Sequence, residues 1–345
     1  MRDAIAIGRR RALQAAGAAA SLPLFSIGRA RAAAPDTIRV AFFVETKPTM
    51  IAKGEGWFEQ MAGAKIQWSE TGSGAEINTG MAAGSFDIGL AIGSSPTAAG
   101  LSQRIPYELI GMVDNIGPAE DMVVRKSDNI HTPADFKGKK VATPFGSTSH
   151  FRLLGFLAVN KLTQADVTVL DMNPNAMVAA WDRGDIDAGY VWAPAKSKML
   201  ENGGVLFSTY KELDAAGYVI ADLIVAHKAF SEKYPDAVVG FLKAYGRALA
   251  LWKTKPDDAA QIVGKQAGVT ADVAKHDMEE YDFVSQKDQL SPEWLGKPRQ
   301  PGKFTGVLMH TAQFLAQQKS IRSAPGLAVF QKGTNTTFLQ RAVST

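Results

Sequence analysis

The feature that most constrains the fold is a short motif that occurs twice, with Gly84, Asp87 and Gly89 recurring one hundred positions later as Gly184, Asp187 and Gly189. The first copy spans residues 82–96 and reads AAGSFDIGLAIGSSP, and the second spans residues 180–194 and reads AWDRGDIDAGYVWAP. Each copy has the pattern of a helix end, a glycine turn, a short apolar strand and a loop at the carboxyl end of that strand. Two such α/β units predict two lobes that face each other across a cleft.

Strand patterns alternate with helix patterns along the rest of the chain, which predicts parallel sheets covered by helices on both faces. We assign residues 37–125 and 225–322 to the first lobe and residues 126–224 to the second. Residues 323–345 form a C-terminal tail whose weak periodicity predicts partial disorder. The expected strands are Thr37–Val44, Lys65–Trp68, Phe86–Ile92, Tyr107–Val113, Asp121–Arg125, Lys140–Pro144, Val167–Leu170, Ile186–Trp192 and Ile220–Ala226.

The N-terminus has the pattern of an export signal. A basic stretch, Gly8–Leu13, precedes the apolar run Ala12–Ile27, and Ala30–Ala32 is a small-x-small cleavage site. Paired arginines favour the twin-arginine route, and the general secretory route is the alternative. A membrane anchor is the less favoured interpretation, because the run is shorter than the roughly 20 residues of a spanning helix. We therefore expect residues 1–32 to be a signal peptide.

Charge and cysteine content exclude several classes of function. The chain has a net charge of +4, but residues 1–32 hold six arginines and one aspartate, which leaves 32 basic and 33 acidic residues. The remainder is thus nearly neutral, and its charge does not indicate a nucleic acid or membrane partner. There is no cysteine, and the five histidines lack the spacing of zinc ligands. The sequence therefore predicts no metal, no cofactor and no catalytic residue.

Two serine-rich loops are candidates for binding an anion. Gly93–Pro96 follows a predicted strand and opens a helix, with Ser94 and Ser95 as hydroxyl donors, and Phe145–His150 does the same with Ser147 and Thr148. Helix N-termini present unpaired N–H groups and a positive dipole end to anions. The alternative is that each serine is a plain helix cap. Because one loop lies in each lobe, the pair would hold a tetrahedral oxyanion between them.

Aromatic and acidic side chains near other strand ends complete the candidate site. Tyr190 and Trp192 end the second repeated strand, where ligands of open α/β sheets bind, although core packing is the alternative. Asp222 lies in the apolar run VIADLIVA, so it needs a partner: a ligand ammonium, a backbone N–H or a structural lysine. Glu45 and Glu120 also follow strands and could reach the cleft, or remain surface groups.

Five motifs together resemble the periplasmic substrate-binding proteins of ABC importers for sulfonates. The resemblance is greatest to the taurine-binding proteins, within the nitrate, sulfonate and thiamine-precursor group, and it covers roughly residues 38–317. The sequence YVWAP after RGDID is fairly specific to this group, whereas GSSP alone is not. The motifs are GSSP (93–96), STSH (147–150), AAWDRGDID (179–187), YVWAPA (190–195) and HTAQFL (310–315).

This resemblance implies a type II periplasmic-binding-protein fold of two α/β lobes joined by a two-strand hinge. It implies a sulfonate held by Ser94, Ser95 and Thr148 near Trp192, and an amine held at the position of Asp222. It further implies an exported, monomeric, non-enzymatic periplasmic protein that closes on its guest and delivers it to a membrane permease with a cytoplasmic ATPase.

Two positions depart from the taurine-binding pattern. Lys47 stands where those proteins have an acidic residue, and Gly72 stands where they tend to have aspartate. The loss of two acids and the gain of a base leave a related sulfonate as an alternative to taurine. Further alternatives are nitrate, a thiamine precursor or an aromatic acid as the guest. An enzyme on the same scaffold is disfavoured, because such enzymes depend on a cysteine.

Overall fold

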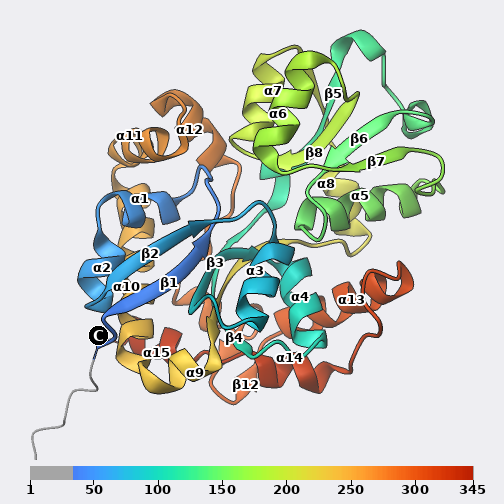
Figure 1. Cartoon of the computed structure of the whole chain (residues 1–345). Coiled ribbons are helices and arrows are strands. Elements are labelled where there is room, and N and C mark those ends of the chain that lie inside the picture. Colours follow the sequence, from blue (N-terminus) through green and yellow to red (C-terminus); the bar gives the residue numbers. More distant parts are fainter. Residues whose placement is uncertain (1–33, 345) are drawn as a thin grey trace, which may run out of the picture. The chain divides into compact units, whose positions relative to one another are not determined.

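Two five-stranded sheets organise residues 34–344, the part of the chain that the computed structural model describes (Figure 1). The export signal expected over residues 1–32 lies outside this part. The first sheet has the order β2-β1-β3-β10-β4 and the second has the order β7-β6-β8-β5-β9. The strands are β1 (Thr37–Phe42), β2 (Lys65–Glu70), β3 (Ile88–Gly93), β4 (Tyr107–Asn115), β5 (Glu120–Arg125), β6 (Lys140–Thr143), β7 (Thr168–Asp171), β8 (Ala188–Trp192), β9 (Gly204–Phe207) and β10 (Ala221–His227).

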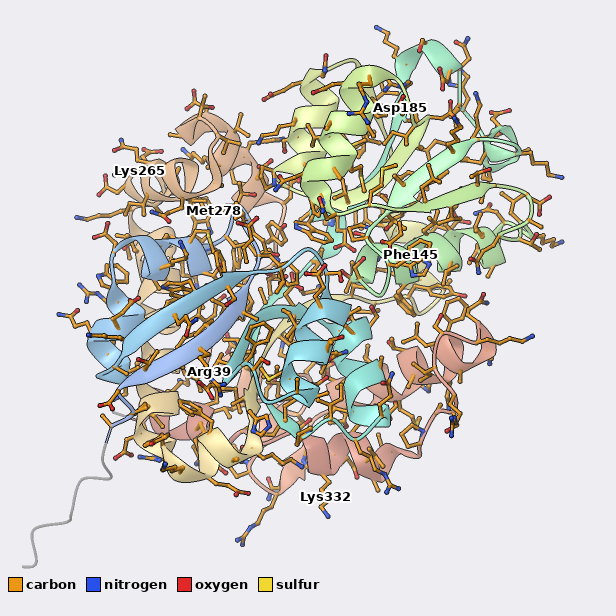
Figure 2. The ribbon with its side chains drawn as sticks, viewed as in Figure 1. Arg39, Phe145, Asp185, Lys265, Met278 and Lys332 are labelled. Atoms are coloured by element: carbon orange, nitrogen blue, oxygen red, sulfur yellow. The ribbon has the colours of Figure 1, made fainter. Side chains whose placement is uncertain are left out.

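The repeated motif supplies the equivalent strand of each sheet. β3 lies parallel to β1, and β8 lies parallel to β6 in the same way. The aspartate of each copy ties its turn to the neighbouring strand: Asp87 Oδ2 accepts a hydrogen bond of 2.8 Å from the N–H of Arg39 (labelled in Figure 2), and Asp187 Oδ2 accepts one of 2.7 Å from the N–H of Lys140. The two copies of the motif therefore form the same connection between neighbouring strands, one in each sheet.

Both sheets are mixed, whereas the alternation of strands and helices predicts purely parallel ones. β10 runs antiparallel to β3, and β5 runs antiparallel to β8. The antiparallel strands are the ones that follow a crossing between the sheets, at residues 116–119 and again before residue 221. The assignment of Asp121–Arg125 to the first lobe is therefore wrong, because β5 pairs with β8 and β9 of the second sheet. The assignment of residues 221–224 to the second lobe is wrong as well, because β10 pairs with β3 and β4 of the first sheet.

Helices cover both sheets, and most of them surround the first (Figure 1). Within residues 34–344, no helix combines the length and the apolar character that crossing a membrane requires. Around the first sheet lie α1 (Pro48–Gly54), α2 (Trp57–Ala62), α3 (Gly74–Ala82), α4 (Ser94–Ser102), α9 (Lys228–Lys233), α10 (Pro235–Thr254), α11 (Pro256–Ala267), α12 (Ala271–Glu279), α13 (Phe304–Gln317), α14 (Leu327–Gly333) and α15 (Thr337–Val343). The second sheet has α5 (Thr148–Val159), α6 (Pro174–Arg183), α7 (Ala195–Glu201) and α8 (Tyr210–Ala215).

Short elements complete the connections. Four are single 3₁₀ turns, η1 (Gly117–Ala119), η2 (Lys126–Asp128), η3 (Pro133–Phe136) and η4 (Asp288–Leu290), and the strands β11 (Gly296–Lys297) and β12 (Gln300–Pro301) form a small hairpin.

The C-terminal tail is ordered, contrary to the expectation of partial disorder. Its helices α14 and α15 pack on the first lobe through the fully buried side chains of Phe330 and Leu339. Each helix has seven residues, so the apolar periodicity extends over only two turns and gives a weak sequence signal.

Candidate functional site

A small cavity of ≈ 20 Å³ lies where the carboxyl ends of β3 and β8 meet the N-terminal ends of α4 and α5. A volume of this size holds about one water molecule. Because residues of both lobes line the cavity and touch one another around it, the structure shows the lobes closed. The lining residues are Phe43, Glu45, Gly74, Ala91, Gly93, Pro96, Glu120, Ser147, Thr148, Trp192 and Asp222.

The serine-rich loops meet at this cavity, as the sequence predicts, but protein groups already engage their hydroxyls. Ser147 caps α5: its Oγ accepts a hydrogen bond of 3.1 Å from the N–H of His150. The Ser95 hydroxyl donates 3.0 Å to the carbonyl of Ser147, which joins the lobes, and Ser94 Oγ accepts from the N–H of Ala221 at 3.2 Å. Ser94 and Ser95 therefore brace the loop, while Ser147 and Thr148 line the cavity.

A buried lysine lies at the centre of the acidic side chains. The Lys47 side chain is 1% exposed, and its ammonium pairs with Asp222, with Asp114 Oδ2 at 3.0 Å and with Glu45 Oε1 at 3.4 Å. The ring centroid of Tyr281 lies 4.4 Å from the same nitrogen. Asp222 therefore has the structural lysine as a partner, which was one of the alternatives for this carboxylate in an apolar run. It also lines the cavity.

Lys47 does not satisfy all the acids around it. Glu120 is 2% exposed, and its Oε2 accepts a hydrogen bond of 2.8 Å from the Thr148 hydroxyl, but its Oε1 has no hydrogen-bond partner within the described part of the chain. Glu45 Oε2 is likewise buried without one. Four buried carboxylates thus share one ammonium, and two of the unpartnered oxygens belong to residues that line the cavity. Such a site leaves more buried carboxyl oxygens than the Lys47 ammonium can pair with, which disfavours their charged forms.

Burial raises the pKa of each of these carboxyl groups, because the low-dielectric interior disfavours the charged form. The pKa of Glu120 rises to about 7, with a further contribution from the negative charge of Asp222, and the pKa of Asp114 rises to about 8. Glu45 has a pKa well above its ordinary value, and that of Asp222 is also raised. In each group the Lys47 ammonium opposes part of the rise.

The protein without a guest is expected to lose stability as the pH rises from about 6.5 to about 9. A carboxyl whose pKa is higher in the folded than in the unfolded state stabilises the fold while protonated, and this stabilisation disappears as the pH rises through the folded-state pKa. For Glu120 and Asp114 those values are about 7 and about 8. Urea unfolding across this range measures the change in free energy.

Measurements between about pH 6.5 and about pH 9 avoid the opposing effect of His150 on the free energy of unfolding. Burial lowers its pKa to about 4, so its contribution is lost only as the pH falls below about 6.5. Asp114→Asn is the matched variant, and it should flatten the slope between about pH 7 and about pH 9. An equally steep slope in this variant would contradict the assignment of the titration to the cluster.

The two aromatic residues of β8 have different surroundings. Trp192 lines the cavity and meets Phe43 of the first lobe edge to face, with ring centroids 5.8 Å apart. Tyr190 does not line the cavity. Its hydroxyl forms a hydrogen bond of 2.9 Å with Thr209 Oγ1, and its ring lies in the core of the second lobe. The core-packing alternative therefore describes Tyr190, because two residues of strand, about 6–7 Å, separate it from the open end.

The predicted binding residues do not include Phe43, Asp114 and Lys47, whose side chains belong to the site or contact it directly. The sequence does indicate that Asp114 is buried, since this carboxylate lies in the apolar run LIGMVDN in the same way as Asp222 lies in its own apolar run. The two aspartates are direct partners in the register of β4 and β10. Phe43 has no comparable signal, because a phenylalanine after a buried strand is ordinary.

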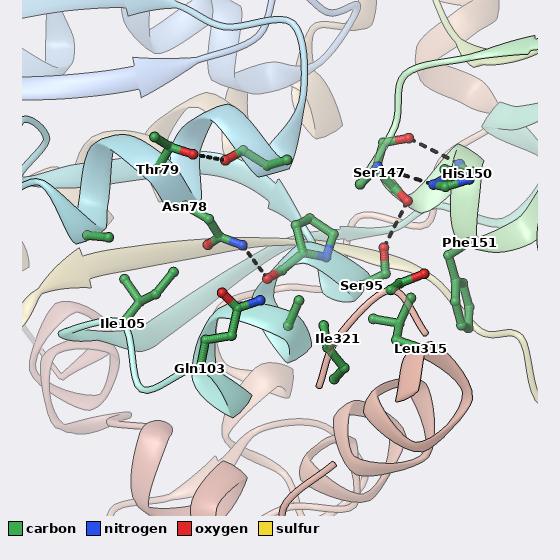
Figure 3. A pocket seen from close by; sticks show the side chains of 16 residues that line it. Asn78, Thr79, Ser95, Gln103, Ile105, Ser147, His150, Phe151, Leu315 and Ile321 are labelled. Carbon is green, nitrogen blue, oxygen red and sulfur yellow. Dashed lines mark hydrogen bonds between the residues drawn. The ribbon is translucent and has the colours of Figure 1, made fainter. Parts of the chain in front are cut away.

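Two larger hollows flank the cavity. One of ≈ 690 Å³ lies beside α3 and α4 and the start of α5, and its lining includes Ser95 and Ser147, which a hydrogen bond joins (Figure 3). The other, of ≈ 550 Å³, shares the Phe43 and Trp192 rings with the cavity. Residues of both lobes line each hollow, and each hollow shares lining residues with the cavity.

Comparisons with known proteins agree with this architecture. Residues 44–259 match the family model described as NMT1/THI5 like. The chain is 31% identical to the taurine-binding periplasmic protein of Escherichia coli, over 82% of this chain and 87% of that protein. It is also 31% identical to a putative aliphatic sulfonates-binding protein of Bacillus subtilis, over 65% of this chain and 68% of that one.

Solved structures show the same fold. The alkanesulfonate-binding protein SsuA from Xanthomonas axonopodis, solved bound to MOPS, superposes with a TM-score of 0.72 at 21% identity, over 88% of this chain and 99% of that chain. The nitrate-binding protein NrtA from Synechocystis superposes with a TM-score of 0.66 at 14% identity, over 90% and 88% of the two chains. The type II two-lobe fold expected from the sequence is therefore confirmed.

Proposed function

The chain belongs to the NMT1/THI5-like family, and from this premise we propose that it is the periplasmic solute-binding component of an ABC importer for small aliphatic sulfonates. The guest whose two opposite charges complement the site best is taurine, 2-aminoethanesulfonate. The observation that carries the proposal is a single cavity in which two helix N-termini meet buried carboxylates with unpartnered oxygens. A zwitterion with one anionic and one cationic end complements both features.

The anionic end of the guest would lie against the helix termini. α4 and α5 have nine and twelve residues, and each leaves first-turn N–H groups without partners inside the helix. These groups and the dipole ends favour a sulfonate without requiring a formal positive charge. Thr148 lines this part of the cavity, and Ser95 keeps the two loops together when the lobes close.

The cationic end would lie against the acids. Glu45 and Glu120 contribute unpartnered oxygens, and Asp222 lines the same wall. A guest ammonium would favour the charged forms of these buried carboxyl groups and give their unpartnered oxygens a partner, whereas a guest that carries only negative charge would do neither. This charge balance favours an aminosulfonate over nitrate or a simple carboxylic acid.

Closure of the lobes around the guest is the mechanism that the two-lobe fold supports. Trp192 and Phe43 would exclude water from one side, and the Ser95–Ser147 contact from the other. The closed protein, a monomer in the periplasm, would deliver the guest to a membrane permease driven by a cytoplasmic ATPase. The role needs no covalent step, and the matched relatives named above are binding proteins.

A panel of guests in a thermal-shift experiment tests the proposal. Taurine is expected to raise the melting temperature most, by several degrees at a hundredfold excess over its Kd, since a guest that binds only the folded state stabilises it by about 3 kcal/mol at that excess. Ethanesulfonate should give a smaller rise, and nitrate, thiamine and benzoate none. The proposal is wrong if one of these last three stabilises the protein and no sulfonate does.

A further inference from the structure

We propose that Lys47 determines which length of aminosulfonate the site accepts, by filling the deep end of the acidic pocket with its own ammonium. The guest's ammonium is then held at the shallower pair, Glu45 and Glu120. This inference rests on the proposed function, because it assumes a guest with a sulfonate at one end and an amine at the other.

The position of Lys47 is behind the cavity wall. Its ammonium pairs with Asp222 and Glu45, both of which line the cavity, yet Lys47 itself is not a lining residue. On its far side lies Asp114, which is fully buried and does not line the cavity either. The lysine therefore occupies the space that an ammonium group would reach if the cavity continued past Asp222.

Several contacts hold Lys47 in this position. It lies at the N-cap of α1, where Pro48 follows it, and its side chain is almost completely buried. Three carboxylates and the ring of Tyr281 surround its nitrogen. Removal of one partner from such a group leaves a buried charge uncompensated, which is strongly unfavourable. A guest ammonium therefore does not displace Lys47 and has to bind elsewhere.

The remaining acceptors, Glu45 and Glu120, both line the cavity. Glu120 is bonded to Thr148 at the start of α5, and its Oε1 has no partner among the described residues. Glu45 Oε2 is also free of hydrogen bonds within this part of the chain. Glu45 follows β1 in the first lobe and Glu120 opens β5 in the second, so an ammonium between them joins the lobes. With the sulfonate at the helix ends, this pair sets a short distance between the guest's charges.

The first test uses the unaltered protein. Titration calorimetry would compare 2-aminoethane-, 3-aminopropane- and 4-aminobutanesulfonate with the corresponding alkanesulfonates that lack the amine. We expect affinity to fall at least tenfold from the two-carbon to the three-carbon aminosulfonate, while the amine-free series changes much less. Equal affinity for the two- and three-carbon aminosulfonates would overturn the role of Lys47. Binding of no sulfonate at all would instead overturn the proposed function.

The second test uses Lys47→Met, which removes the ammonium but keeps an unbranched side chain. The deep acids then become available, so the affinity ratio of the three-carbon to the two-carbon aminosulfonate should rise at least tenfold. Lys47→Arg should keep the original ratio. Lys196→Met is the matched control, because Lys196 is equally buried but pairs with Glu280 away from the cavity. An unchanged ratio in a folded Lys47→Met protein would overturn the inference. If that variant fails to fold, the comparison of aminosulfonate chain lengths in the unaltered protein is the test that decides.

Discussion

Replacement of Gly93 by alanine is expected to weaken the binding of every sulfonate by about 10- to 100-fold, whether or not the guest carries an amine. A Cβ at this position would lie 2.6 Å from Thr148 Cγ2 and 3.3 Å from Thr148 Oγ1. Gly93 ends β3 in the first lobe and Thr148 begins α5 in the second, so the overlap occurs only when the lobes close. Each lobe by itself can accept the added methyl group, and titration calorimetry would measure the loss of affinity.

Two further variants separate closure from other effects of the substitution. In the double variant Gly93→Ala with Thr148→Ser, the methyl group that collides is absent while the hydroxyl remains, so part of the affinity should return. Gly306→Ala is the matched control, because an added Cβ there meets nothing within 4 Å. Wild-type affinity in the single Gly93→Ala variant would show that the guest binds with the lobes further apart than in this structure.

Replacement of Glu120 by glutamine is expected to weaken the binding of taurine by about 10- to 100-fold, since a hydrogen bond to a charged group contributes about 1.5–3 kcal/mol. The substitution keeps the size of the side chain and an oxygen that can accept from Thr148, but it removes the charge that faces the guest's ammonium. Ethanesulfonate has no ammonium, and it should bind equally well or more tightly because the substitution removes the negative charge that Glu120 carries when ionised. The ratio of the two dissociation constants is the measured quantity.

Glu108→Gln is the matched control for this experiment. Glu108 is partly buried and accepts hydrogen bonds from Ser231 at 2.6 Å and Asn335 at 3.0 Å, but it does not line the cavity. It should leave both affinities unchanged. If Glu120→Gln weakened taurine and ethanesulfonate by the same factor, Glu120 would act only by positioning Thr148, and the amine would bind elsewhere.

The parts of the site that the sequence predicts are those with a local signal. Ser147 caps α5, which agrees with the capping alternative for these loops, because a serine after a strand and before a helix accepts a hydrogen bond from the N–H three residues on. Asp222 lines the cavity, because a carboxylate in an apolar run is buried and requires a charged partner. Tyr190 was assigned to the cleft on the same kind of local evidence, and the structure places it in the core instead.

The sequence alone determined that the chain contains two copies of one α/β unit and that a helix begins beside the end of each repeated strand. Periodicity, caps and glycine turns act over a few residues, so they can be read directly from the order of amino acids. The tertiary structure decided which acid is neutralised and which remains available to a guest. Lys47 and Asp222 are 175 residues apart, and their pairing depends on how β1 and β10 come together in one sheet. Electrostatic partnership depends on distance through space and on burial, and neither is contained in a local pattern.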